Sequence, residues 1–547
     1  MSKLMAVCAV AVAGSILFTL AEPRPAFATT RYIAQKAGAF SGGTACNGQT
    51  AITPATFNGI TNSPGDVNYI CGAITAATGP VFSPQGSGNS TSPVTFIFDT
   101  GARISVSFGE VINLGGLAYA LFDGGIPCGP SSPCDTVEAS NPTSYATGQA
   151  GIIEATANGS SLQYQNPNTQ AFYGCVNCHD IEIRNLIIRN LYVHSSTSDQ
   201  TDSADTGTFA FQCPFSNGCA AGTISIHDSS IHDVGNAVSI EGTTATSIKI
   251  YNVDFSHDNW AVENSGNGTR YLYIYGNYFH DTTNWDTSSD SFHHNGVHNY
   301  MNVSTDSLGY YFYNNMSFGD WGPCCSTAIM LFTEVAHPAN FYVFNNIAIQ
   351  SCNNNTAPVN QDYTAPSGPG ESWYNNTFLG CPTTGSNTWA LQFYGLNMSD
   401  ENNAVQGWGQ YVTVGSGYSF KAIDYNVYGS PGSSGNSPYQ CGNSGVSAFA
   451  PWQATGCSPD AHGQSVSDIQ VNSSTAFPSS TSPLRATGIN LTSICNGQPN
   501  PGLGALCYDY AGKARPTTGN WDVGAVSYST SKSPNPPIGL TGTVVSH

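Results

Sequence analysis

The sequence predicts an all-β solenoid, a fold in which each turn of the chain adds one coil to a stack. Two observations carry the prediction: a strand-like pattern recurs along the chain, and a second pattern recurs in register between its copies. Repeats of this kind indicate units that bury their apolar faces against their neighbours. The alternatives are a β-sandwich and a β-propeller, but neither predicts a ladder that aligns in two registers.

The first pattern alternates apolar with polar residues and ends in Asn, Asp or Gly. Its copies are Ile181–Asn185, Ile224–Asp228, Ile248–Asn252, Leu272–Gly276, Tyr310–Asn314, Phe341–Asn345 and Glu371–Asn375. Their starts are 43, 24, 24, 38, 31 and 30 residues apart, which indicates a coil of 24 residues that carries loops of varying length. Asn, Asp and Gly tolerate the bend that a coil must make.

The second pattern lies between copies of the first. Its copies are Ala237–Gly242, Ala261–Gly266, Ser291–Gly296, Ala328–Thr333 and Ala390–Gly395. Because side chains alternate between the faces of a strand, one column is expected to point into the core. That column is Val238, Val262, Phe292, Ile329 and Leu391, and its inward neighbour is Ile240, Asn264, His294, Leu331 and Phe393. The outward columns are Ser239, Glu263, His293, Met330 and Gln392, and Glu241, Ser265, Asn295, Phe332 and Tyr394.

Composition excludes several functional classes. The 547 residues carry a net charge of −20, with 14 Lys and Arg against 34 Asp and Glu and no basic cluster. Such a surface repels nucleic acid and anionic membranes, so we expect neither as a partner. Hydrophobic residues make up 40% and aromatic residues 11% of the chain, which argues against disorder. We expect a monomer.

The N-terminal segment is typical of a secretory signal. Lys3 begins it, an apolar stretch follows from Leu4 to Leu20, and Ala26-Phe27-Ala28 is a small-x-small cleavage site. A membrane anchor is the alternative, although residues 22 to 25 interrupt the apolar run. We therefore expect a secreted protein that begins near Thr29 and has no membrane span.

Sixteen cysteines remain once Cys8 is removed with the signal, an even number that favours disulfides. The expected bridges are Cys46–Cys71, Cys128–Cys134, Cys175–Cys178, Cys213–Cys219, Cys441–Cys457 and Cys495–Cys507, and Cys324, Cys325, Cys352 and Cys381 form two more. A zinc site made of Cys175, Cys178 and His179 is the rival interpretation. The sequence has no second CxxC pair to complete such a site, which argues against it.

The strand repeats that end in Asn, together with Asp424–Tyr428 and Gly519–Tyr528, carry a family resemblance. Over roughly residues 90–430 the chain resembles the right-handed parallel β-helix proteins of the pectate-lyase-like superfamily. The segment at 519–528 looks like a closing motif of secreted bacterial β-helix proteins. The signatures of pectate lyases, polygalacturonases and pectin methylesterases are missing, so the resemblance implies a fold and no specific enzyme family.

The resemblance divides the chain into five parts. Residues 1–28 are the signal peptide, and residues 29–90 form the N-terminal cap that a solenoid needs at its open end. Residues 91–430 form the parallel β-helix. Residues 431–530 form a loop-rich region that packs on the last coils, and residues 531–547 form a Pro-rich tail or linker.

In β-helix enzymes the substrate lies along one outward strand ladder, which directs attention to Glu263. Glu263 and His293 are predicted neighbours on adjacent coils, a distance at which a carboxylate can orient an imidazole for acid–base catalysis. Glu241 and Asp290 are further acid or base candidates, because paired carboxyl groups cleave glycosidic bonds. The competing interpretation is that these are polar side chains on a solvated sheet without a function.

Other residues are predicted to contact substrate or metal. The expected substrate contacts are Asn295, Trp285, His298, Phe332, Gln392 and Tyr394, because aromatic rings suit the C–H faces of sugars. Asp281, Asp286 and Asp290 could form an oxygen-rich Ca²⁺ site, and no other cofactor is expected. Metal binding by the nearby histidines is an alternative.

The sequence thus predicts a secreted protein that binds a polysaccharide and cleaves its glycosidic bonds by hydrolysis. The scarcity of cations disfavours a lyase that acts on uronic acids, unless Ca²⁺ bridges the acidic substrate. A calcium-assisted polysaccharide lyase and a non-catalytic glycan-binding adhesin are the two alternatives.

Overall fold

The computed structural model describes most of the chain, and its regular structure is nearly all β. The described residues are 28–134, 150–156, 169–191, 208–214, 218–267, 270–281, 294–300, 308–321, 326–336, 338, 340–350, 358–367, 370–381, 389–432, 437–457 and 460–529. Residues 1–27 and the residues from 530 onward lie outside them.

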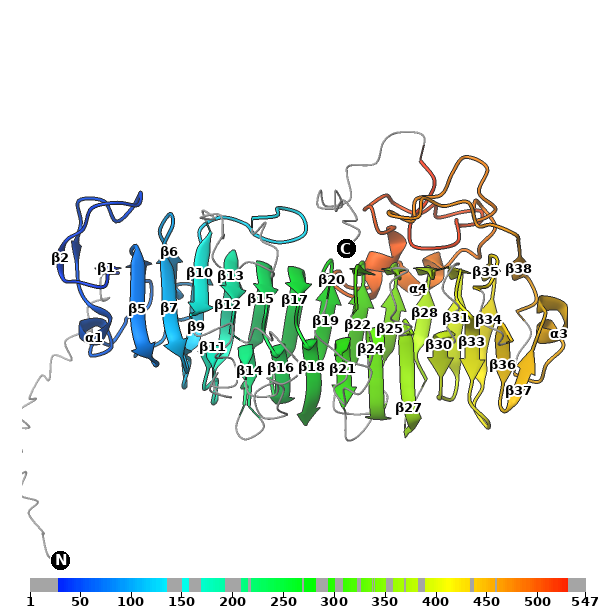
Figure 1. Cartoon of the computed structure of the whole chain (residues 1–547), viewed down its shortest axis with the longest axis horizontal. Coiled ribbons are helices and arrows are strands. Elements are labelled where there is room, and N and C mark those ends of the chain that lie inside the picture. The colour runs from blue at the N-terminus through cyan, green and yellow to red at the C-terminus, as the bar shows by residue number, and fades with distance from the viewer. Residues whose placement is uncertain are drawn as a thin grey trace, which may run out of the picture.

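Two large sheets built mainly from parallel strand pairs run the length of the molecule, one of 24 strands and one of twelve in the described part of the chain. Strands follow one another along the stack in chain order, from blue to orange (Figure 1). A typical coil places two short strands in the larger sheet and then one in the smaller sheet. This arrangement is compatible with the predicted solenoid.

The larger sheet contains two strand rows after the N-terminal coils. Its strands are β1 Thr30–Ile33, β4 Val67–Ile70, β5 Ala73–Thr78, β6 Val94–Phe98, β7 Arg103–Phe108, β9 Ala118–Asp123, β10 Gly151–Ala155, β12 His179–Arg184, β13 Leu186–Arg189, β15 Thr223–His232, β17 Ser247–Ser256, β19 Tyr271–Tyr275, β20 Tyr278–His280, β22 Gly309–Tyr313, β23 Met316–Phe318, β25 Phe341–Phe344, β26 Ile347–Ile349, β28 Ser372–Tyr374, β29 Thr377–Leu379, β31 Met398–Glu401, β32 Ala404–Gln406, β34 Phe420–Asp424, β35 Val427–Tyr428 and β38 Gln464–Ser465.

The smaller sheet carries the candidate site. Its strands are β8 Ile112–Asn113, β11 Gln170–Tyr173, β14 Phe209–Cys213, β16 Asn236–Gly242, β18 Trp260–Asn267, β21 His294–Tyr300, β24 Ser326–Ala336, β27 Asn360–Ser367, β30 Trp389–Phe393, β33 Gln410–Val414, β36 Tyr439–Cys441 and β37 Ser444–Val446. The remaining elements are the hairpin of β2 Gly38–Ala39 and β3 Thr50–Ala51, the helices α1 Pro54–Phe57, α3 Phe449–Gln453 and α4 Thr492–Cys495, and the 3-10 helix η3 Leu503–Cys507.

The first predicted ladder is confirmed. Ile181, Ile224, Ile248, Leu272, Tyr310 and Phe341 pair in sequence along the larger sheet. The residue that ends each copy has a positive φ, as in Asn185 (59°), Asp228 (48°) and Gly276 (66°). This left-handed conformation suits Gly, Asn and Asp, so the strand-ending residues make the corner between the two strands of a coil.

A ladder of buried asparagines follows these corners inside the stack. Its members are Asn277, Asn315, Asn346, Asn376, Asn403 and Asn426, each at most 1% exposed. Asn346 Nδ2 donates to Asn376 Oδ1 at 3.0 Å and to Phe312 O at 3.0 Å, and its Oδ1 accepts from the Asn315 backbone N at 2.9 Å. The ladder satisfies backbone groups that the turn leaves unpaired, and therefore ties each coil to the next.

The second predicted ladder is correct for its first coils and wrong beyond them. Val238 pairs with Val262 and Ser239 with Glu263. Glu263 then pairs with His298 and not with His293, and Val297 takes the place predicted for Phe292. Register shifts around β16, β21 and β24 mark bulges that a constant repeat cannot represent.

Further along the same sheet the predicted register shifts again. Leu331, and not Ile329, stands in the Val238 column, and Phe332 stands in the column of Glu263. The inward positions predicted for His294 and Leu331 beside Asn264 belong to Asn299 and Thr333. Ile329 and Met330 are both buried, so the outward position predicted for Met330 is wrong.

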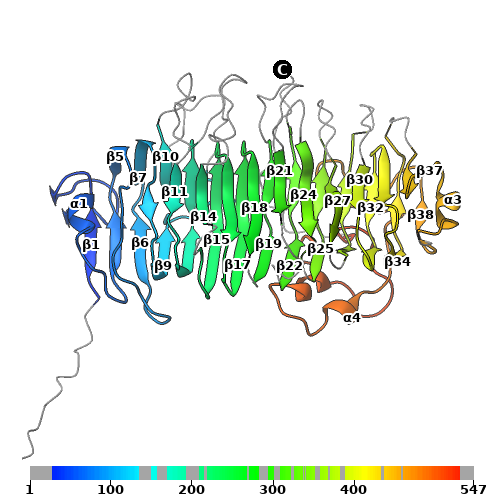
Figure 2. The ribbon, with the colours of Figure 1, turned by 90° about the horizontal axis from the view of Figure 1, so that it is seen from below.

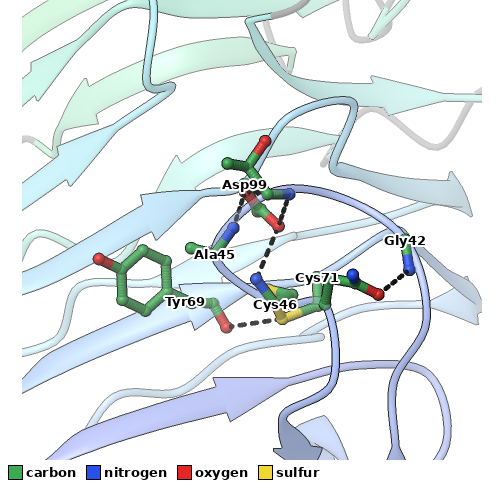
Figure 3. Close-up of a disulfide and its surroundings, with 8 residues drawn as sticks. Gly42, Ala45, Cys46, Tyr69, Cys71 and Asp99 are labelled. Atoms are coloured by element: carbon green, nitrogen blue, oxygen red, sulfur yellow. Dashed lines mark hydrogen bonds between the residues drawn. A yellow bond between two sulfur atoms is a disulfide. The ribbon is translucent and has the colours of Figure 1, made fainter.

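The N-terminal coils are closed by a disulfide-bonded loop (Figure 3). Cys46 and Cys71 form the disulfide. Asp99 accepts hydrogen bonds from the backbone N–H groups of Thr44, Ala45 and Cys46 at 2.9 to 3.1 Å. These contacts lower the pKa of Asp99 against the opposing effect of its burial, so the carboxylate stays charged and holds the loop.

The six bridges predicted between neighbouring cysteines are confirmed. They are Cys46–Cys71, Cys128–Cys134, Cys175–Cys178, Cys213–Cys219, Cys441–Cys457 and Cys495–Cys507. Cys381 is also disulfide-bonded, while Cys324, Cys325 and Cys352 lie outside the described residues.

The segment after the last coil folds back along the larger sheet, where α4 lies beside β22 and β25 (Figure 2). Leu491, Leu506 and Trp521 pack on Tyr313 and Phe344 of that sheet. The smaller sheet keeps its candidate site away from this covering segment. In the described part of the chain, no helix is both long enough and apolar enough to cross a membrane.

Replacing Asn346 tests the asparagine ladder. Asn346→Ala leaves several buried groups without a hydrogen-bond partner. Each such group costs about 1 to 3 kcal/mol, so we expect the free energy of unfolding to fall by about 2 to 4 kcal/mol. Urea unfolding measures the loss. The control Asn520→Ala removes an exposed side chain with one bond to Ala486 O and should change stability little.

Candidate functional site

Five consecutive strands of the smaller sheet, β14, β16, β18, β21 and β24, bring the candidate residues together (Figure 1). One outward column runs from Gln212 through Ser239, Glu263 and His298 to Phe332. Parallel strands lie about 4.8 Å apart, so neighbours in this column can touch. The inward residues of the same strands, such as Val238 and Val262, are fully buried and hold the sheet on the core.

Two carboxyl groups share one hydroxyl at the centre of the site. Ser239 Oγ is 3.0 Å from Glu241 Oε1 and 3.1 Å from Glu263 Oε2, so the two carboxyl oxygens are at most about 6 Å apart, the sum of the two contacts. Gln212 Nε2 donates to Glu241 Oε1 at 2.8 Å, and Asn236 Nδ2 donates to Glu263 Oε2 at 3.2 Å. These donors fix the positions of both carboxyl groups.

The shared hydroxyl makes the two carboxyl groups unequal. Ser239 carries one hydroxyl hydrogen and can donate it to only one carboxylate at a time. The other carboxyl completes the bridge only when it is protonated and donates to Ser239 Oγ. Burial raises the pKa of Glu263, and the nearby Glu241 charge adds to the rise, while His298 and Ser239 oppose it. The raised pKa makes the protonated form of Glu263 more favourable than it is for a free glutamic acid.

Glu334 holds the imidazole of His298 beside Glu263. His298 Nε2 lies 2.9 Å from Glu334 Oε2, and the imidazole is 7% exposed. In the tautomer whose Nε2–H donates to Glu334, Nδ1 carries the lone pair, and this buried atom has no hydrogen-bond partner among the described residues. This geometry presents a base that a carboxylate orients.

Aromatic rings surround the imidazole. The Trp260 ring centroid is 4.7 Å from that of His298, and Phe332 stacks on the other side at 5.2 Å. Tyr300 is 6.2 Å away and 43% exposed. The rings shield His298 from water and leave an exposed phenol at the rim of the site.

Several predicted substrate contacts lie elsewhere on the sheet. Asn295 was expected to face outward, but it is 1% exposed and its Oδ1 accepts from Ala328 N, which corrects that prediction. Gln392 donates to Tyr394 Oη at 3.2 Å, four strands beyond Glu263 and therefore about 19 Å from it. His293, Asp290, Trp285 and Asp286 lie outside the described residues.

Asp281 is engaged by the protein itself. Its Oδ2 lies 2.8 Å from His280 Nδ1 and its Oδ1 accepts from Asp320 N at 2.8 Å. The His280 contact lowers the pKa of Asp281 against the effect of burial. Its partners in the predicted Ca²⁺ site, Asp286 and Asp290, are not described. Within the described ranges, only Cys175, Cys213 and Cys219 form a group of three metal-ligand side chains in mutual reach.

Sequence reasoning missed Glu334, Gln212 and Asn236, and it gave Ser239 no role. It placed His298 among the substrate contacts, whereas the register makes His298 the neighbour of Glu263. The signal for this register is present in the sequence: Val262-Glu263-Asn264 matches Val297-His298-Asn299 at both flanking positions. The prediction followed the Gly at position 296 instead.

Comparison with protein-family models gives no match, and comparison with curated proteins gives no significant match. The site is therefore interpreted from its own geometry.

The raised pKa of Glu263 predicts a pH-dependent effect on stability. The folded protein holds this proton more tightly than the unfolded chain, whose pKa is near 4.5, so the stabilising contribution is complete below pH 4.5 and is lost as the pH rises through the raised pKa. Glu263→Gln removes the titrating carboxyl group, so the variant does not lose this stability as the pH rises. Urea unfolding should show that the variant gains on the wild type between pH 4 and pH 7.

Asp468→Asn is the control, because it removes one negative charge from an exposed side chain that follows β38 of the larger sheet. A Glu263→Gln profile that runs parallel to the wild-type profile across this range would show that Glu263 titrates normally.

Proposed function

We propose that the chain is a secreted right-handed parallel β-helix protein of the pectate-lyase-like kind that hydrolyses glycosidic bonds of a polysaccharide. The carboxyl pair Glu263 and Glu241, bridged by Ser239, is the single observation that carries the proposal. Carboxyl pairs that cleave glycosidic bonds lie about 5 to 9.5 Å apart. The disulfides support an extracellular location, since such bridges persist in oxidising compartments.

In this mechanism the two carboxyl groups have different roles. Glu263, whose pKa is raised, donates a proton to the glycosidic oxygen as the bond to the leaving sugar breaks. Glu241 acts on the opposite side, either by attacking the sugar or by taking a proton from water. Water supplies the hydroxyl group of the new reducing end. Ser239 then lets a proton pass between the two carboxyl groups between turnovers.

The composition of the smaller sheet indicates the substrate class. None of its strands contains Lys or Arg, whereas Glu241, Glu263 and Glu334 all lie on them. An acidic face without cations repels a polyanion. The outward column continues past the site to Gln361, as an extended polymer requires. We therefore favour a neutral or weakly acidic glycan.

A lyase is the second candidate, and His298 is the observation that favours it. Glu334 orients the imidazole of His298, and an oriented imidazole is the kind of base that takes a proton beside a sugar carboxylate. Elimination also requires a positive group to neutralise that carboxylate, and the strands of this sheet offer none. A glycan-binding adhesin is the remaining alternative.

Products from a glycan panel separate these functions. We expect new reducing ends without the ultraviolet absorbance of an unsaturated uronate. Glu263→Gln and Glu241→Gln should each lower turnover by about 10²- to 10⁴-fold while binding changes little, because each removes an acid–base or nucleophilic group. Gln440→Ala, in the same outward column but far from the site, is the matched control.

Unsaturated products that depend on His298 would establish the lyase instead. Retention of a glycan without cleavage would show that the protein binds the glycan and does not hydrolyse it. If the Glu263 and Glu241 variants retain the glycan equally well, this site is not the binding site.

A further inference from the structure

Two of the disulfides lie together at one corner of the stack. Cys175 and Cys178 lie between β11 and β12, and Cys213 and Cys219 lie at the end of β14, one coil further on. The two loops are bonded through their backbones, with Asn177 N donating to Gly218 O at 3.1 Å and Ala220 N donating to Cys178 O at 2.8 Å. The cysteines of neighbouring coils are therefore held side by side.

Three of the four sulfur atoms form one cluster, and the fourth is bonded to it. Cys175 Sγ lies 3.0 Å from Cys219 Sγ, across the gap between the two disulfides. The sulfur atoms of Cys175, Cys213 and Cys219 all lie within 4.8 Å of one another, and Cys178 is bonded to Cys175. Each of these cysteines is at most 1% exposed. Two disulfides that served only to staple separate loops would not need this contact.

We propose that these four cysteines are a redox-dependent metal site, which in its reduced state binds one divalent thiophilic metal ion of the Zn²⁺ class. A dithiol or phosphine reductant supplies two electrons per disulfide, and with four protons in all it converts the two S–S bonds into four thiols. The metal ion then displaces the four thiol protons and forms four metal–sulfur bonds.

The present geometry is close to what a tetrahedral site requires. Zinc–sulfur bonds of about 2.3 Å place the sulfur atoms of a tetrahedron about 3.8 Å apart. The 3.0 Å contact between Cys175 and Cys219 must lengthen by less than 1 Å, and the bonded pairs must open by about 2 Å. Side-chain rotations supply movements of this size, so the backbone bonds between the two loops can remain.

The surroundings select the kind of metal. All ligands are sulfur, and the four cysteines belong to the main apolar core of the stack. Thiolates in a site without water favour Zn²⁺, Cd²⁺ or Co²⁺ over Ca²⁺ and Mg²⁺. The cluster lies inside the stack, whereas the carboxyl pair faces outward, so this inference does not depend on the proposed hydrolysis.

The sequence did not reveal the site because its halves differ in spacing. Cys175 and Cys178 form a CxxC pair, which raised the zinc interpretation, but Cys213 and Cys219 are six residues apart. His179, the other ligand considered, has its Nδ1 bonded to Asp180 Oδ2 at 2.8 Å. The stacking of adjacent coils supplies the second pair.

Cobalt uptake by the reduced protein tests the proposal. The full chain is reduced anaerobically with a phosphine, the reduced bridges are mapped by alkylation and mass spectrometry, and Co²⁺ is titrated in. We expect one equivalent bound with the visible d–d bands and the sulfur-to-cobalt charge-transfer band of a tetrahedral tetrathiolate. Zn²⁺ should displace it and raise the thermal midpoint of the reduced protein.

The variant Cys175→Ser/Cys219→Ser should lose this equivalent and its spectrum. The matched control Cys441→Ser/Cys457→Ser, which removes a single isolated bridge, should keep both. A reduced cluster that binds no tetrathiolate cobalt overturns the proposal. Failure of both bridges to reduce under conditions that reduce Cys441–Cys457 overturns it as well, because the proposal requires a reachable reduced state.

Discussion

The hydrogen-bonded ladder of buried asparagines, together with the left-handed residue at each preceding corner, is the constraint on which the structure depends. Each corner turns the chain between two short strands, and each buried amide pairs backbone groups that the turn leaves open. Because the same arrangement repeats from coil to coil, it fixes the height of one coil above the next. A side chain on one strand therefore meets a defined partner on its neighbour, however long the loop between them.

The candidate site is a product of this register. Glu241, Ser239 and Glu263 come from adjacent strands, and His298 and Glu334 from the next two, so no short sequence motif contains the constellation. Burial on this face raises the pKa of Glu263, and the shared hydroxyl ties this carboxyl group to Glu241. The same packing of adjacent coils brings Cys175 against Cys219 at the corner of the stack.

Sequence patterns predicted the features that depend on residues close together in the chain. The strand-ending Asn, Asp and Gly residues and the alternation of the first ladder are short-range features, and the bridges between near cysteines close short loops. The second ladder is interrupted by long loops and by bulges near Ile240 and Asn295. The predicted alignment of this strand was wrong by five residues, which is why His293 was predicted where His298 lies. Because five is an odd number, the same error also exchanges the two faces of the strand. Glu334 was missed because its role depends on that register.

A double-mutant cycle on Glu263 and His298 tests the register most directly. Contacting residues show coupling energies of about 0.5 to 3 kcal/mol, and distant ones add within about 0.5 kcal/mol. Unfolding free energies of Glu263→Gln, His298→Ala and the double variant should therefore reveal coupling above about 0.5 kcal/mol, while the cycle of Glu263→Gln with Gln392→Ala, four strands away, should be additive. Additivity of Glu263 and His298 would contradict the register and the site built on it.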